Sequence, residues 1–168
     1  MAYTLEQLAA DCHAAMVEDS GPAGREKIRQ YVSKACLDDE FVAKYLGPEN
    51  TTPRQVLYED PDFGFCILAH VYVGAKASTP HDHAGHWAIY SQAAGETEMT
   101  EWKCLERPSA GKPGKVAKEK SYVMKRGDAC LYDENTLHSP RREATTRLIR
   151  VEGRDLTNVK RDKYEVAA

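Results

Sequence analysis

The stretch Pro80-His81-Asp82-His83-Ala84-Gly85-His86-Trp87 decides the fold and indicates the chemistry of this chain. Side chains of a β-strand alternate between its two faces, so His81 and His83 share a face if the stretch is extended. A third histidine, His138, follows much later in the sequence. If a neighbouring strand brings His138 beside the pair, three imidazoles hold a divalent metal and leave part of its coordination sphere open. The pattern therefore predicts an open metal site in a β-rich fold.

A β-rich fold is also indicated by the sequence from Val56 onward, which consists of short apolar or alternating runs separated by turn residues. This is typical of an antiparallel barrel or sandwich. The segment from Arg107 to Lys120 is rich in lysine, proline and glycine, and we expect a solvated loop there. The expected strands are 55–59, 64–74, 79–83, 86–94, 97–105, 121–125, 128–133, 137–140 and 146–152.

Three helices are expected before the strands. Thr4 and Gln7 form a capping box at the start of an apolar helical pattern. A second helix is expected after Gly21-Pro22, and a third after Asp38-Asp39, ending at Gly47. We expect these helices to pack against the outside of the barrel.

Length and charge limit the organisation and the partners. A chain of 168 residues is long enough for one domain and short for two. The net charge is −3 with both signs interspersed, so neither nucleic acid nor a membrane surface is an expected partner. Apolar runs fall far short of the roughly 20 residues of a spanning helix, and the N-terminus lacks the pattern of a signal peptide. We expect a cytoplasmic single domain over 1–168, with a helical segment 1–50, a β-barrel 55–152 and a charged tail 153–168.

The cysteines indicate a reduced protein. Their number is odd and no two are spaced as Cys-x-x-Cys, which argues against a disulfide framework. We expect mostly buried thiols at Cys12, Cys36, Cys66, Cys104 and Cys130.

The spacing around the histidines resembles the two conserved motifs of the cupin superfamily. The first motif reads Gly74, six residues, His81-x-His83, four residues, Ala88, six residues, Gly95. The second reads Gly127, five residues, Asp133-x-Asn135, two residues, His138. The resemblance extends from about residue 57 to about residue 152 and implies a mainly β fold, a cupin-type antiparallel β-barrel (jelly roll).

The common cupin pattern has a glutamate ligand at the position of Ala88. A three-histidine cupin without it is similar to the thiol dioxygenases, which act on cysteine or 3-mercaptopropionate, and to the diketone-cleaving dioxygenases. The resemblance implies Fe(II) held by His81, His83 and His138, with Zn, Ni or Cu left open because imidazole binds all of them. Three neutral ligands call for an anionic small-molecule substrate beside O2. A homodimer is a further suggestion of the resemblance alone.

Alternation along the strands predicts which side chains line the barrel. Counting from Ala88 turns Tyr90 and Gln92 inward, and counting back from His81 turns Tyr72 and His70 inward. Tyr90 is a candidate catalytic residue, and the other three are candidates for substrate contacts. His86 is a second catalytic candidate, although a metal ligand or a structural role stays open because turn residues precede it.

Arginine is the natural clamp for a substrate carboxylate because its planar fork binds the two oxygens together. Arg54 lies close to where thiol dioxygenases carry such an arginine, and a surface or internal ion-pair role is equally open for it. Arg150 is expected to face inward, where it either binds substrate or pairs with Glu152.

Two features depart from the cysteine dioxygenases. Ala88 stands where mammalian-type enzymes have a cysteine crosslinked to tyrosine, and Leu148, Arg150 and Glu152 stand where a serine-histidine-tyrosine relay is expected. The favoured function is oxidation of a thiol to a sulfinate by a mononuclear non-heme dioxygenase. The alternatives are cleavage of a diketone, a non-oxidative lyase or isomerase reaction, and ligand binding without turnover.

Overall fold

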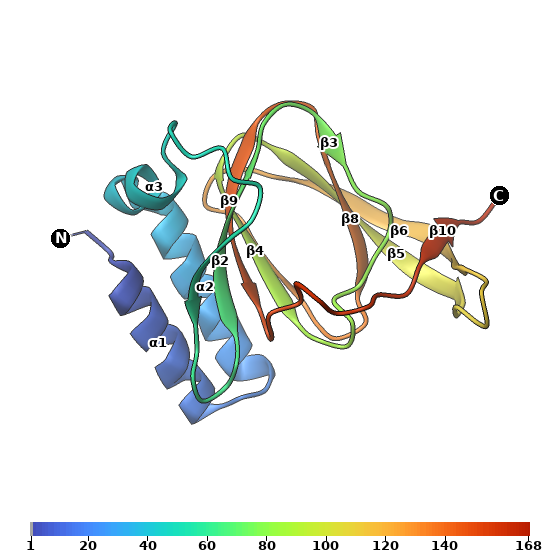
Figure 1. The fold of residues 1–168 in the computed structure, drawn as a ribbon, viewed down its shortest axis with the longest axis horizontal. Helices are drawn as coiled ribbons and strands as arrows, with labels where there is room; N and C mark the ends of the chain where they lie inside the picture. The colour runs from blue at the N-terminus through green and yellow to red at the C-terminus, as the bar shows by residue number, and fades with distance from the viewer. Residues whose placement is uncertain (1) are drawn as a thin grey trace.

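The computed structural model describes residues 2–168, in which three helices precede ten strands (Figure 1). The helices are α1 (Leu5–Glu18), α2 (Pro22–Leu37) and α3 (Asp39–Leu46). The strands are β1 (Gln55–Glu59), β2 (Cys66–Tyr72), β3 (Lys76–Ala77), β4 (Ala88–Ala94), β5 (Thr97–Glu106), β6 (Gly114–Met124), β7 (Ala129–Tyr132), β8 (Leu137–Arg142), β9 (Thr146–Glu152) and β10 (Tyr164–Val166).

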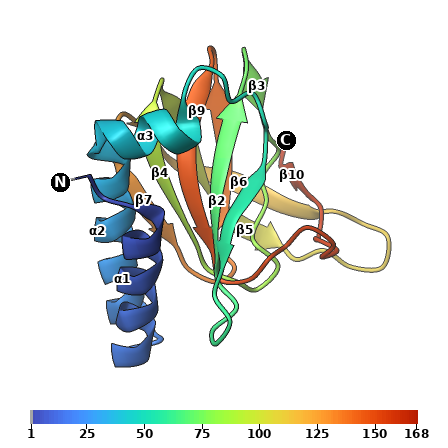
Figure 2. The same cartoon turned by 60° about the vertical axis from the view of Figure 1, so that its left-hand side comes forward.

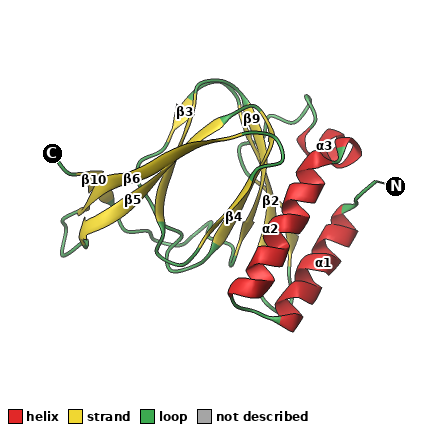
Figure 3. Ribbon diagram, turned by 180° about the vertical axis from the view of Figure 1, so that it is seen from behind, coloured by secondary structure: helices red, strands yellow, loops and turns green. Residues whose placement is uncertain are grey.

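All three helices begin where the sequence predicts. The Thr4 hydroxyl accepts a hydrogen bond from the Gln7 amide at 3.1 Å, and Asp38 accepts one from the Phe41 amide at 2.9 Å. Pro22 opens α2, where its missing N–H is no loss. The helices cover the outer face of one sheet, as Figures 2 and 3 show.

The strands form two five-stranded sheets, ordered β1-β2-β9-β4-β7 and β10-β6-β5-β8-β3. Neighbouring strands run antiparallel except β10, which pairs with β6 in parallel. The two sheets face each other and enclose the barrel interior (Figure 1). The architecture is a mainly β fold of two facing sheets with three N-terminal helices packed outside, as expected.

Side chains of the first sheet alternate between a face covered by the helices and a face turned to the barrel interior. Ile67, Ile89 and Val151 belong to the large apolar cluster shared with the helices. On the other face, Ala88 and Tyr90 belong to a separate cluster with residues of the second sheet. Tyr90 pairs across the strands with Arg150, so an arginine is carried into the interior.

The expected loop over 107–120 is wrong in its second half. β6 begins at Gly114 and runs beside β5, with Val116 fully buried while most of its charged neighbours stay exposed. The strand is hard to predict because its lysines, whose long side chains face solvent, interrupt the apolar/polar alternation of its sequence. The expected strand at 79–83 is reduced to one isolated bridge between His81 and His138, and the charged tail includes the short strand β10.

Two further findings bear on the sequence expectations. All five cysteines are free thiols, and Cys12, Cys36 and Cys66 are buried. Within residues 2–168, no helix has both the length and the apolar character needed to span a bilayer.

Gly24 in α2 offers a test of the helix packing. Replacing glycine by alanine inside a helix normally stabilises it by about 1 kcal/mol. Here a Cβ atom would lie 1.7 Å from the Asp19 carbonyl oxygen and 2.7 Å from that of Ala15. We expect Gly24→Ala to lower the free energy of unfolding by about 1–3 kcal/mol in urea denaturation. The exposed neighbour supplies the control, Ala23→Gly, and a stabilised Gly24→Ala protein would contradict this packing.

Candidate metal centre

Three histidines converge in the barrel interior. His81 and His138 face each other across paired backbones, with the two amide-to-carbonyl hydrogen bonds at 3.0 and 2.9 Å. His83 lies two residues further on, and its Nε2 is 3.0 Å from Nε2 of His138. One ring nitrogen from each histidine lies within 4.8 Å of the others. The predicted grouping of His81, His83 and His138 is confirmed.

Hydrogen bonds of the His81 and His138 rings determine which ring nitrogen is available to a metal. His81 Nδ1 lies 2.8 Å from the Thr79 carbonyl oxygen, and His138 Nδ1 lies 3.0 Å from that of Thr136. A carbonyl only accepts, so each Nδ1 must carry the proton and each Nε2 keeps a lone pair. Ring nitrogens so oriented are ready to bind a metal.

The spacing of the nitrogens fits a metal ion. Two imidazole ligands at about 2.1 Å from one ion are separated by roughly 3.0–3.4 Å, depending on the angle between them. The two Nε2 atoms of His83 and His138, 3.0 Å apart, have this separation. The three rings could therefore hold a divalent ion, whose identity the imidazoles alone do not select.

Burial keeps these rings neutral. It lowers the pKa of His81 to about 4 and holds the pKa values of His83 and His138 well below the usual value. The neighbouring histidines and the Arg150 guanidinium act in the same direction for His83. Neutral imidazole is the form that binds metals, so no proton has to be removed near pH 7.

Glu152 lies behind the His83 ring. Its Oε1 is 3.9 Å from His83 Nδ1, on the opposite side of the ring from Nε2. Glu152 is 1% exposed and pairs across the strands with Ala88. Its carboxylate lies 3.4 Å from Arg150 Nη1 and 3.5 Å from Arg54 Nη2. At 3.9 Å the contact is too long for a hydrogen bond, and His83 Nδ1 is buried without a hydrogen-bond partner among residues 2–168. The carboxylate therefore acts on the ring through its charge alone.

The position of Glu152 beside the His83 ring is not predicted from the sequence, in which Glu152 is a partner of Arg150 and occupies one place of the missing relay. The available signal was its place on the last barrel strand opposite the Ala88 position. It does not replace the missing cupin glutamate, because it is not part of the group whose ligand atoms lie within 4.8 Å of one another.

The Tyr90 hydroxyl lies beside the Nε2 atoms of His83 and His138. Its hydroxyl oxygen lies 3.1 Å from His83 Nε2 and 3.2 Å from His138 Nε2. Burial raises the pKa of this phenol, so it keeps its proton. The Arg150 guanidinium lies 4.2 Å from the centre of the Tyr90 ring and fixes the ring from one face. A protonated donor therefore stands beside the candidate metal position.

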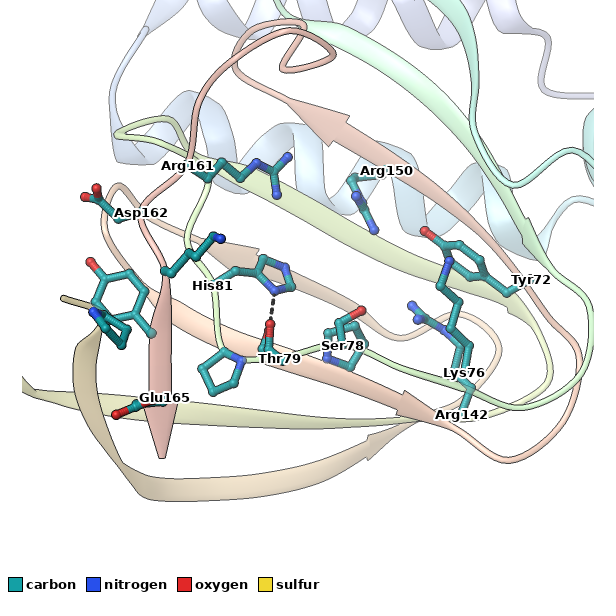
Figure 4. A pocket seen from close by; sticks show the side chains of 15 residues that line it. Tyr72, Lys76, Ser78, Thr79, His81, Arg142, Arg150, Arg161, Asp162 and Glu165 are labelled. Atoms are coloured by element: carbon teal, nitrogen blue, oxygen red, sulfur yellow. Dashed lines mark hydrogen bonds between the residues drawn. The ribbon is translucent and has the colours of Figure 1, made fainter. Parts of the chain in front are cut away.

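A cavity of about 690 Å³ has His81, one of the three histidines, in its wall (Figure 4). Its charged lining is mostly positive, because Asp162 and Glu165 are its only two acidic residues against five basic ones. The C-terminal segment contributes Arg161 and Lys163, for which the sequence reasoning assigned no role. The basic lining residues are Lys76, Arg142, Arg150, Arg161 and Lys163.

Of the other residues predicted to contact substrate, some line the cavity and others do not. Tyr72 and Arg150 line the cavity. Arg54 is not part of this wall, and binds Asp155 at 3.0 Å and Thr157 at 2.8 Å.

Two inward-facing polar residues are engaged inside the barrel instead. The His70 Nδ1 atom lies 2.9 Å from the Pro53 carbonyl oxygen. The Gln92 amide donates to the Ala94 carbonyl and accepts from Thr97. Neither residue is part of the cavity wall.

His86 lies outside the histidine group. The chain turns at Ala84 and Gly85, whose φ angles are 53° and 80°. The turn ends the alternation that begins at His81, and His86 lines a different cavity together with Glu59 and Arg154. The structure therefore does not bring His86 to the metal-binding nitrogens.

Several solved proteins are similar to this chain at low identity. A cupin superfamily protein from Desulfitobacterium hafniense is 10% identical, with a TM-score of 0.45, over 61% of this chain and 76% of that chain. KdgF from Halomonas sp. is 18% identical, with a TM-score of 0.45, over 59% and 74%. A cupin-2 domain containing protein from Shewanella frigidimarina is 11% identical, with a TM-score of 0.47, over 70% and 95%.

No protein-family model matches the chain, and no curated protein matches it. The chemistry of the site is therefore inferred from its own geometry.

Removing the charge behind His83 should weaken metal binding. We expect Glu152→Gln to reduce the affinity for Co²⁺ or Zn²⁺ by about 10-fold, because the Nδ1 side of the ring loses a nearby negative charge. Competition with a chromophoric chelator measures this. Glu143, an exposed glutamate that pairs with Arg141, supplies the control Glu143→Gln. Equal affinities in the two variants would show that Glu152 has no part in the site.

Proposed function

We propose that this chain is a mononuclear non-heme iron(II) dioxygenase acting on a small anionic substrate that chelates the metal. The favoured substrate is a thiol related to cysteine or 3-mercaptopropionate, and the product is the sulfinate. The observation that carries the proposal is a group of three neutral imidazoles, one of which, His81, lines a cavity with excess positive charge.

The reaction is RS⁻ + O2 → RSO2⁻, in which both oxygen atoms enter the product and the sulfur is oxidised. Iron(II) held by the three histidines would supply the redox chemistry and would bring the thiolate and dioxygen together. Three neutral ligands leave the charge of a divalent ion uncompensated, and an anionic sulfur donor compensates it.

Tyr90 has the role of a positioning and proton-donating group. Its hydroxyl lies 3.1 and 3.2 Å from the two Nε2 atoms and keeps its proton. A neutral phenol there donates a hydrogen bond to negative charge that builds up on the reacting oxygen or sulfur atoms. Arg150 packs on the Tyr90 ring and holds this donor in place.

A substrate carboxylate is favoured over an uncharged diketone by the position of Arg150. This arginine lies in the cavity wall, and its Nε has no hydrogen-bond partner among residues 2–168. Diketone cleavage needs no such group. The thiol reaction would proceed without a cysteine-tyrosine crosslink, because Ala88 occupies the position of the cysteine.

A non-oxidative lyase or isomerase reaction is the second candidate. It is favoured by the protonated Tyr90 phenol, which could transfer a proton to a substrate polarised by any divalent ion. Activity without dioxygen and with zinc or nickel distinguishes this reaction from the first.

Oxygen consumption tests the proposed function. Protein loaded anaerobically with Fe(II) is offered small thiols, mercapto-acids and β-diketones, and uptake is followed with an oxygen electrode. We expect uptake with one class of thiol and formation of the matching sulfinate. His138→Ala should abolish uptake, whereas His86→Ala, a histidine outside the group, should retain most of it. Full iron occupancy without uptake for any substrate would contradict the dioxygenase proposal.

The Tyr90 hydroxyl can be tested separately. We expect Tyr90→Phe to lower kcat about 100-fold, because it removes the donor and keeps the ring. Metal affinity should change little. Tyr45→Phe on α3 is the control, and an unchanged kcat in Tyr90→Phe would remove the hydroxyl from the mechanism.

A further inference from the structure

We propose that Arg142, together with Lys76 and Tyr72, forms an oxyanion-binding subsite in the cavity wall, apart from the histidine group. It would take the carboxylate or phosphate group of a substrate whose other end reaches the metal. The claim that a substrate occupies this subsite rests on the proposed function. The claim that the subsite binds an oxyanion does not depend on it.

The first observation is the isolation of the Arg142 side chain. Arg142 is 3% exposed, and its Nε and Nη2 atoms are buried without a hydrogen-bond partner among residues 2–168. Its neighbour Arg141 is exposed and binds Glu143 at 2.9 Å. Burying two guanidinium N–H groups without an acceptor is unfavourable. Of the two adjacent arginines, the one without an ion pair among residues 2–168 lies in the cavity wall.

The second observation is the pairing of like charges. Lys76 on β3 lies directly opposite Arg142 on β8. Cations in this relation repel each other. Both approach the Tyr72 ring, with Lys76 Nζ at 4.5 Å and Arg142 Cζ at 4.4 Å from the ring centre. The face of an aromatic ring offsets only part of such repulsion, and an anion between the cations offsets more.

The third observation concerns the kind of anion. Nε and Nη2 form the side-on edge of a guanidinium, from which two parallel N–H bonds point outward. This edge matches two oxygens of a carboxylate or phosphate. Burial lowers the pKa of Arg142, and the nearby Arg150 guanidinium acts in the same direction.

The position of the group explains what it adds to the metal site. Figure 4 shows Tyr72, Lys76 and Arg142 together at one end of the cavity, away from His81. Arg150 lies on the wall between these two regions in the same view. A ligand that fills both regions is therefore a bifunctional anion, with a metal-binding donor at one end and an oxyanion at the other.

Binding of simple oxyanions to metal-free protein tests the subsite without any turnover. Inorganic phosphate and succinate are titrated separately at fixed ionic strength, with sodium chloride as the balancing salt. The arginine Nε–H signals are followed by ¹⁵N NMR, and calorimetry gives the affinity. We expect a saturable shift of a signal that is absent from Arg142→Lys. The anion that binds more tightly identifies the group as phosphoryl or carboxylate.

Matched variants of the adjacent arginines decide the assignment. Arg142→Gln should weaken binding at least about tenfold, as expected for lost hydrogen bonds to a charged group, and Arg141→Gln should leave it unchanged. Circular dichroism checks that both variants fold. If one does not fold, the titration of the unmodified protein still decides whether an oxyanion binds. No saturable binding, or equal loss in both variants, would overturn the subsite. Oxyanion binding that persists in a protein without oxygen uptake would retain the subsite and reject the dioxygenase.

Discussion

The site depends on the backbone pairing of His81 with His138. Two segments far apart in the sequence meet there through a reciprocal pair of hydrogen bonds. In each histidine, Nδ1 donates to the carbonyl two residues earlier, at Thr79 and at Thr136. The same local geometry thus orients both rings and frees both Nε2 atoms. His83 joins them because it lies two residues beyond His81, and Glu152 stands behind its ring.

Charge is distributed so that the interior favours anions. The three imidazoles are neutral, because burial depresses their pKa values. The buried Glu152 carboxylate is balanced by Arg150 and Arg54. The remaining basic groups of the cavity have few acidic partners, so a ligand with negative charge replaces interactions that the protein lacks. The proposed metal site and the proposed anion site therefore belong to one electrostatic arrangement.

Much of this could be predicted from the sequence because it follows from local rules. Capping residues located the helices, and the period of two placed Tyr90 and Arg150 inside the barrel. The metal-binding group followed from the spacing of the two histidine motifs. Prediction failed where side chains conceal the pattern or where chain reversal breaks it. Lysines masked β6, the turn at Ala84 and Gly85 moved His86 away, and Arg142 lies beyond the expected end of its strand at residue 140.

The central claim is that the three histidines bind one divalent ion and leave its other positions open. X-ray absorption spectroscopy of protein loaded with one equivalent of Fe(II) or Co(II) tests it most directly. The account predicts one tightly bound ion with three imidazole ligands at about 2.0–2.2 Å, completed by exchangeable water. A spectrum with fewer than three imidazoles, or with a protein carboxylate in the first coordination sphere, would contradict it.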